Sequence, residues 1–179
     1  PRGGRWPSSR RWRGGSRTSA ECSGPTGQWR HSGGLRYIAG MSVWRRQALE
    51  RFPELARELQ LPDGDPMSLR TPYALFGRLL ELVVGAHAAG DRPFLVRAYG
   101  FAAECARSPS FDVWNAAGVS FYEHLADGPA TREGIPEWVP PDVFRNVSPL
   151  LRARMRETEF RALLRRYEER WGAGFVHGG

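Results

Sequence analysis

The 179-residue chain contains no lysine, and all 26 of its basic residues are arginine. Lysine codons are rich in A and T, whereas the codons of arginine, glycine, proline and tryptophan are rich in G and C. The bias therefore indicates a GC-rich gene rather than selection for guanidinium chemistry. It also excludes a phosphate-binding P-loop, because that loop needs a lysine beside its glycines.

Cysteine and long apolar runs are also scarce. The two cysteines, Cys22 and Cys105, do not make a disulfide framework, so we expect a reducing, cytoplasmic location. The most apolar stretch, Leu79–Val84, is interrupted by Glu81 and is too short to span a membrane. The sequence therefore predicts no membrane partner.

Charge is distributed unevenly along the chain. Residues 1–40 contain eight Arg and one acidic residue, together with nine Gly and three Trp. Residues 41–179 contain eighteen Arg and eighteen Asp or Glu. The formal charge of +7 therefore belongs to the first forty residues, and the remainder is neutral.

We predict that residues 1–40 form a disordered basic leader, because so polar and Gly-rich a segment cannot fold alone. Two interpretations of it remain open. Arg-Gly-Gly at 2–4 and 13–15, with interleaved Trp, is typical of segments that contact RNA phosphates and stack on bases. The favoured interpretation is that these are translated upstream codons outside the native product, with synthesis starting at Met41, where the composition changes abruptly.

Residues 41–172 are predicted to form a single helical domain, followed by a frayed end at 173–179. Apolar residues recur at helical spacing, and no segment alternates convincingly as a strand. We expect helices over about 43–60, 72–89, 92–107, 111–126 and 158–171, with short ones after Pro140 and Ser148. The fold class is therefore all-α, either an irregular six- to seven-helix bundle or stacked helical hairpins of the HEAT type.

Three details of these helices are specific enough to check. Thr71-Pro72 and Asp91 have the residue types that start helices. Trp114 falls on an apolar stripe with Phe121 and Leu125, which predicts that it is buried. Four glycines lie inside expected helices, each costing about 1 kcal/mol relative to Ala, so we expect close helix approaches there. They are Gly77, Gly85, Gly100 and Gly118.

Three stretches resemble a family of small uncharacterised bacterial helical proteins. They are Arg51-Phe52-Pro53-Glu54-Leu55-Ala56, Pro72-Tyr73-Ala74-Leu75-Phe76-Gly77 and Trp114-Asn115-Ala116-Ala117-Gly118-Val119-Ser120-Phe121-Tyr122-Glu123-His124-Leu125. The resemblance extends over roughly residues 50–170. It implies a stand-alone helical domain and supplies no activity, ligand or catalytic residue.

The side chains in the expected helices that could bind a metal or take part in catalysis are Glu81, His87, Glu123 and His124. A metal site or an enzyme pocket would need them to converge. Their spacing argues against it, because no Glu is followed by His three residues later, as di-iron bundles require. The alternative is a surface histidine and an ion pair such as Arg78–Glu81. We therefore predict no metal, cofactor or catalytic residue.

Trp138 and Cys105 each have two interpretations. Trp138 lies in a proline-rich segment, Ile135–Pro141, expected to connect two helices. It could anchor a partner protein, but covering the core is the favoured interpretation. Cys105 could be a nucleophile, but its place on an apolar stripe favours a small core residue.

The function that best fits the sequence is binding of another protein without catalysis, as an adaptor or an immunity-type protein. The first alternative is a metal-dependent or other enzyme that uses Glu81, His87, Glu123 and His124. The second is nucleic-acid binding through the basic leader, if residues 1–40 belong to the native protein.

Overall fold

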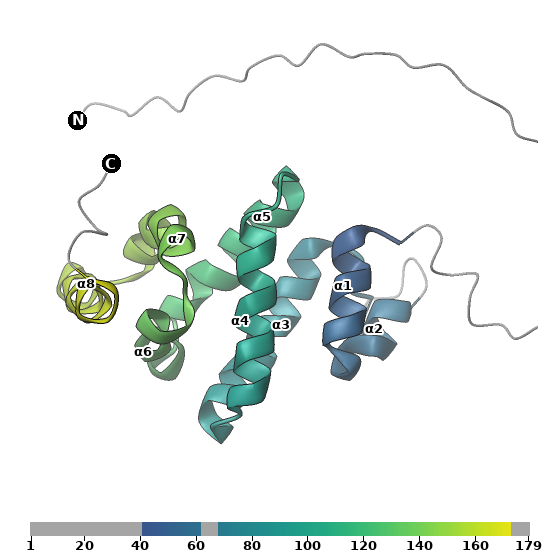
Figure 1. Cartoon of the computed structure of the whole chain (residues 1–179), viewed down its shortest axis with the longest axis horizontal. Coiled ribbons are helices and arrows are strands. Elements are labelled where there is room, and N and C mark those ends of the chain that lie inside the picture. Colours follow the sequence, from purple (N-terminus) through teal and green to yellow (C-terminus); the bar gives the residue numbers. More distant parts are fainter. Residues whose placement is uncertain (1–40, 62–67, 173–179) are drawn as a thin grey trace, which may run out of the picture. The chain divides into compact units, whose positions relative to one another are not determined.

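The computed structural model describes residues 41–61 and 68–172, which all belong to one compact unit, Arg36–Gly179 (Figure 1). The predicted all-α class is confirmed, because the described residues contain helices and no strand. The predictions for residues 1–40 and 173–179 fall outside the described part of the chain. None of the described helices has the length and apolar character needed to cross a membrane.

Within the described residues, eight α-helices and three shorter helical turns follow one another. They are α1 (Val43–Arg51), η1 (Pro53–Leu55), α2 (Ala56–Gln60), α3 (Pro72–Ala89), α4 (Arg92–Ala106), α5 (Phe111–Ala117), η2 (Gly118–Tyr122), η3 (Glu123–Ala126), α6 (Pro129–Trp138), α7 (Pro141–Arg154) and α8 (Glu157–Trp171). In Figure 1, α1 and α2 lie on one side of α3 and α4, and α6 to α8 lie on the other.

Local chemistry sets the two ends of α3 and the start of α4 as the sequence predicts. The Thr71 hydroxyl accepts a hydrogen bond from the Ala74 amide at 3.1 Å, and proline follows at the first helical position. Gly90 ends the helix with φ of 68°, a left-handed conformation that favours glycine. Asp91 then caps α4 by accepting from the Phe94 amide at 3.1 Å.

Prolines change the helix boundaries in two places. Pro53 ends the first expected helix and starts the separate turn η1 before α2. Pro149, by contrast, lies inside one continuous α7, although we expected a new helix there. Proline has no amide to donate to the Arg145 carbonyl one turn earlier, and the Ser148 hydroxyl donates to that carbonyl instead, at 3.2 Å. The carbonyl that the proline deprives of its donor is therefore satisfied inside the continuous helix.

The hydrophobic core is centred on α3, α4 and the α5–η3 segment. Aromatic rings run through it in contact, with centroid distances of 5.4 Å for Phe52–Phe101, 5.8 Å for Phe76–Phe101 and 6.0 Å for Phe76–Phe121. All four side chains are almost completely buried. Aromatic pairs at such distances stabilise a core beyond the area that they bury.

The close helix approach occurs at a glycine that we did not predict. A Cβ on Gly134 of α6 would lie 2.6 Å from a ring carbon of His87 on α3. At Gly77, Gly85 and Gly100 a Cβ would meet nothing within 4 Å, and at Gly118 it would make an ordinary 3.5 Å contact. The prediction of close helix approaches at these four glycines was therefore wrong, because the close contact depends on which helix packs against α6 and not on the propensity of glycine.

Candidate protein-binding face

The structure places Trp114 at the surface, where the sequence predicted a buried residue. Its side chain is 41% exposed, while its neighbour Val113 is buried. The reason is η2, a π-helical turn at Gly118–Tyr122, which places one extra residue in the helix. The residues before the turn are therefore rotated relative to Phe121 and Leu125, and Val113 takes the inward position that a regular helix would give to Trp114.

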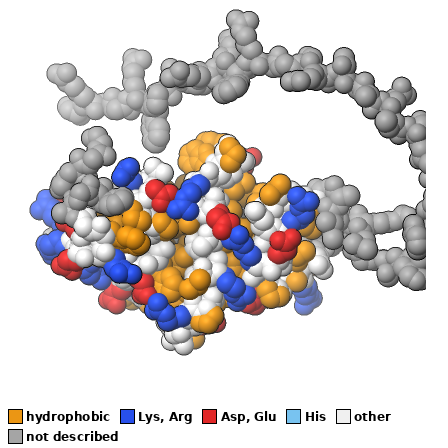
Figure 2. Space-filling model, in the orientation of Figure 1, with side chains coloured by type: hydrophobic (Ala, Val, Ile, Leu, Met, Phe, Trp, Pro, Cys, Tyr) orange, Lys and Arg blue, Asp and Glu red, His pale blue; other side chains and the backbone are white. Residues whose placement is uncertain are grey.

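Trp114 is part of an exposed aromatic group, which we call the aromatic face and define as Tyr73, Phe111 and Trp114. The rings of Phe111 and Trp114 meet edge to face with centroids 5.1 Å apart, and Phe111 is 62% exposed. Tyr73 is 38% exposed, and its hydroxyl accepts a hydrogen bond from Nδ2 of the Asn115 side chain at 2.8 Å. That bond joins the start of α3 to α5. Figure 2 shows hydrophobic side chains gathered over this end of α5.

Beside the aromatic face in sequence lies a groove of about 670 Å³, formed where α1, α3, α4 and α5 begin or end. Its lining includes Trp44, Pro72 and Val113 together with Glu104 and Arg107. The lining has four charged residues, of which Arg70 and Asp112 are opposite in sign, and Glu104 and Arg107 are matched by partners outside the groove. Arg51 binds both carboxylate oxygens of Glu104, and Arg107 binds both of Asp142. The hydrogen bonds from Arg107 lower the pKa of Asp142 below its ordinary value. The groove therefore mixes apolar and polar side chains, and its two basic and two acidic lining residues balance in charge.

Cys105 lies at this groove but is buried, with 4% of its side chain exposed. Burial raises the pKa of its thiol to about 12. A thiol with so high a pKa is a poor nucleophile, because the thiolate is the reactive form. This agrees with the interpretation of Cys105 as a small core residue.

The four polar candidates do not gather in one pocket. Glu81 is exposed and accepts a hydrogen bond from Arg78 at 2.7 Å, the pair that the spacing suggested. His87 contacts the Tyr99 hydroxyl through Nε2 at 3.0 Å. Burial lowers the pKa of His87, so the neutral imidazole is favoured. Across residues 41–61 and 68–172, no group of three His, Cys, Asp or Glu is arranged to hold a metal ion.

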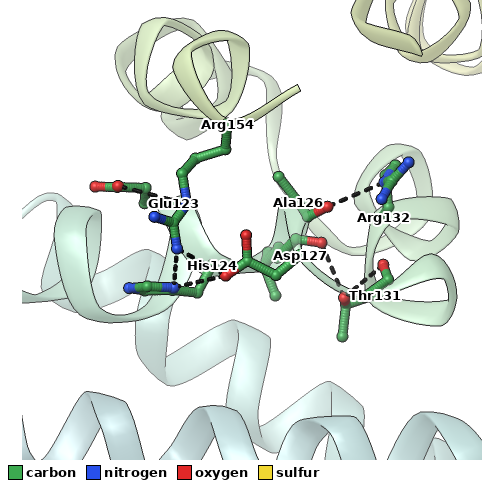
Figure 3. A network of polar contacts seen from close by, with 9 residues as sticks. Glu123, His124, Ala126, Asp127, Thr131, Arg132 and Arg154 are labelled. Atoms are coloured by element: carbon green, nitrogen blue, oxygen red, sulfur yellow. Dashed lines mark hydrogen bonds and ion pairs between the residues drawn. The ribbon is translucent and has the colours of Figure 1, made fainter. Parts of the chain in front are cut away.

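Glu123 and His124 do lie near each other, but an arginine occupies the position that a cation would take. Arg154 of α7 donates to Asp127 at 2.7 Å, contacts Nδ1 of His124 at 2.6 Å and lies 3.7 Å from Glu123. Figure 3 shows its guanidinium between the two carboxylates. Partial burial acts to raise the pKa of Asp127, but the bonds with His124 and Arg154 outweigh it and lower that pKa. The network therefore fastens η3 to α7.

A second set of contacts in Figure 3 fixes the turn into α6. The buried Thr131 hydroxyl donates to the Leu125 carbonyl at 2.8 Å, and Arg132 donates to the Ala126 carbonyl at 3.0 Å. Arg132 also pairs with Glu159 of α8 at 2.9 Å. These side chains satisfy carbonyls at the end of η3, a structural task that leaves their polar atoms occupied.

Trp138 lies at the end of α6, because the proline-rich segment that we expected to be a connection is helical up to this residue. The indole is partly buried against the core and stacks on Tyr99, with centroids 5.7 Å apart and an angle of 14°. The Arg92 guanidinium lies over its ring, 5.0 Å from the centroid. Trp138 thus covers the core, and the arginine covers Trp138.

The fold and these contacts define a small all-α domain with an exposed aromatic face. The chain belongs to the family described as Domain of unknown function (DUF7674), whose model matches residues 45–153. This confirms the resemblance to a family of uncharacterised helical proteins. The match includes the whole aromatic face and ends inside α7, so α8 lies beyond it. No curated protein and no solved structure matches the chain.

Proposed function

We propose that the chain is a non-catalytic module of a bacterial cytoplasm that binds another protein through the aromatic face, as an adaptor or immunity-type protein. The observation that carries this proposal is the exposure of Phe111 and Trp114, held edge to face at the surface. Aromatic residues, above all Trp and Tyr, supply much of the binding energy of protein interfaces. An apolar or aromatic side chain of the partner would fit the adjoining groove.

The origin of this exposure supports a functional role. The π-helical turn at Gly118–Tyr122 rotates Trp114 outward and leaves its large apolar surface in water. Turns of this kind are rare and occur frequently at functional sites. A complex would bury the apolar area of Trp114 that the folded monomer leaves in water.

The contacts of the polar candidates favour binding over catalysis. Glu123 and His124 are engaged by Arg154, and His87 is engaged by Tyr99. A catalytic site would instead need such groups to point together into an open pocket. The single described cysteine is a buried free thiol, which suits a reducing compartment.

The test compares two double variants in affinity capture from lysates of the native cells, with isotope labelling for quantitation. Phe111→Ala with Trp114→Ala removes the aromatic face. Val84→Ala with Val96→Ala is the matched control, because it removes two exposed apolar side chains from α3 and α4. We expect the amount of one specific protein captured by the first variant to fall at least about tenfold, and the control to capture as much of it as the parent does.

Both variants should keep their free energy of unfolding within about 0.5 kcal/mol of the parent, because exposed side chains contribute little to stability. Equal capture by both variants would contradict the proposal, since the partner would then be bound elsewhere.

A further inference from the structure

A second groove, at the other end of the described helices, has a different chemistry. It runs between α7 and α8 and has a volume of about 300 Å³. We call it the basic groove and define it by its lining, which is Pro141, Phe144, Arg145, Ser148, Pro149, Arg152, Phe160 and Leu164. Two of these residues are arginines, and none is acidic. In Figure 2, hydrophobic side chains lie between basic ones at this end of the domain.

The floor of the basic groove is apolar and firmly supported. Phe144 and Phe160 are 4% and 7% exposed, so each shows only an edge to the groove. Phe144 stacks on Tyr167 with ring centroids 3.9 Å apart, and the Tyr167 hydroxyl donates to the Val139 carbonyl at 2.8 Å. A floor held in this way is preorganised, so little conformational entropy is lost when a ligand is bound.

The rim carries an excess of positive charge. Arg152 donates to the Glu157 carboxylate at 3.1 Å, and Arg161 donates to the same carboxylate at 3.0 Å. One negative charge is thus shared by two guanidinium groups. Arg152 also lies 5.9 Å from the Phe160 ring centroid, a cation–π contact that keeps its charge at the groove edge.

The charge of the whole region points the same way. Residues 141–171 contain eight Arg and five Asp or Glu, a formal charge of +3. Residues 41–140 contain ten Arg and thirteen Asp or Glu, a formal charge of −3. The neutral charge of residues 41–179 therefore hides a polarity between these two regions, and an acidic ligand is attracted toward α7 and α8.

We propose that the basic groove binds an acidic amphipathic segment of a partner protein. One or two aliphatic or aromatic side chains of that segment would enter the groove, and flanking Asp or Glu would meet Arg145 and Arg152. Open grooves between two helices commonly take an amphipathic helix whose apolar residues follow helical spacing. The electrostatic complementarity supplies orientation and speed of association, and the apolar floor supplies affinity.

This proposal rests on the proposed role as a protein-binding module but assigns a separate surface. Its test uses fluorescein-labelled synthetic helical peptides and fluorescence anisotropy. The first peptide has Leu at helical spacing and Glu flanks, the second has Lys in place of Glu, and the third is oligoglutamate. We expect the Leu/Glu peptide to bind, and to weaken at least about tenfold between about 50 mM and about 500 mM NaCl. The other two peptides should bind at least about tenfold more weakly.

Variants locate the binding. Arg145→Glu with Arg152→Glu should weaken the Leu/Glu peptide at least about tenfold. Arg165→Glu with Arg170→Glu is the matched control, because it changes the net charge equally on α8 and neither residue is among those that line the groove or share Glu157. It should weaken binding less than about threefold. Leu164→Ala, which keeps every charge, should also weaken binding, and Trp114→Ala should leave it unchanged.

Each other outcome overturns the proposal in a recognisable way. Equal losses of affinity in the two double arginine variants would mean that net charge alone attracts the peptide. If oligoglutamate bound with the same affinity as the Leu/Glu peptide, the apolar floor would have no part in binding. A chain ending at Gly172 that binds far more tightly would mean that residues 173–179 are the occupant. Loss of peptide binding in Trp114→Ala would place the ligand on the aromatic face. Circular dichroism of each variant confirms that it is folded.

Discussion

The aromatic face exposes whole rings and the basic groove shows only the edges of Phe144 and Phe160, and the two surfaces also differ in charge. Near the aromatic face, Glu104 and Arg107 are each matched by a bidentate partner. The lining of the basic groove has two arginines and no acidic residue. Apolar side chains alone therefore do not define a ligand. The charges around them do, because the aromatic face suits a neutral surface of a partner and the basic groove suits an acidic one. The two surfaces would allow one small domain to bind two unlike partners.

The largest expected effect is on the support of the basic groove. Tyr167→Ala removes a fully buried ring, its stacking on Phe144 and its hydrogen bond to Val139. We expect a loss of about 3–5 kcal/mol in the free energy of unfolding, measured by denaturant titration. Leu164→Ala, on the groove side of the same helix, should cost less than about 1.5 kcal/mol. Equal costs would show that the floor and the groove surface are not distinct.

The next effect concerns the contact between α3 and α6, which lies between the aromatic face and the basic groove. Gly134→Ala places a Cβ against the His87 ring and should destabilise the domain by about 1–3 kcal/mol. Gly100→Ala, at an exposed helical position with no atom within 4 Å, should instead stabilise it by about 0.5–1 kcal/mol. Thermal unfolding of both variants measures the opposite signs, and a stabilising Gly134→Ala would contradict the close approach.

A smaller effect at the same contact depends on pH. Burial lowers the pKa of His87 below its unfolded value of about 6.5. The stability from neutral His87 is therefore fully present above about pH 6.5 and is lost as the pH falls through the lower pKa of the folded state. The Tyr99 hydroxyl contacts the ring, and the charge of Glu137 opposes the shift. His87→Gln does not titrate, so it should lose less melting temperature than the parent between pH 8 and pH 5; equal losses would contradict this role.

The smallest expected effect is that of removing residues 1–40. Both surfaces lie in residues 41–172, so a chain that starts at Met41 should melt within a degree or two of the full chain. It should also lose any salt-sensitive RNA binding, because the excess of arginine lies in the removed residues. RNA binding retained by the shorter chain, measured by filter binding, would assign it to the basic end formed by α7 and α8.

The sequence predicted the helical class and several helix ends because these depend on local patterns. Thr71 and Asp91 act within one turn of themselves, and their predicted roles at the starts of α3 and α4 are confirmed. Pro149 misled the prediction, because its missing donor is replaced by the neighbouring Ser148 hydroxyl. Glycine also misled it, since the close approach at Gly134 depends on a histidine that lies far away in sequence.

The candidate surface was missed for a related reason. Trp114, Phe121 and Leu125 have the spacing of a buried stripe, and only a regular helix would keep them on one side. The π-helical turn at Gly118–Tyr122 breaks that regularity, and no residue type in the sequence predicts it. The basic groove was missed because its walls come from two helices, so its arginines and phenylalanines become neighbours only after folding.

The central claim, that the aromatic face binds another protein, is tested most directly by site-specific cross-linking in the native cells. A photoreactive benzoylphenylalanine replaces Phe111 in one chain and the exposed Val96 in another. The account predicts a discrete cross-linked protein from position 111, lost when Trp114→Ala is added, and none from position 96. No product from position 111, or the same product from both positions, would contradict it.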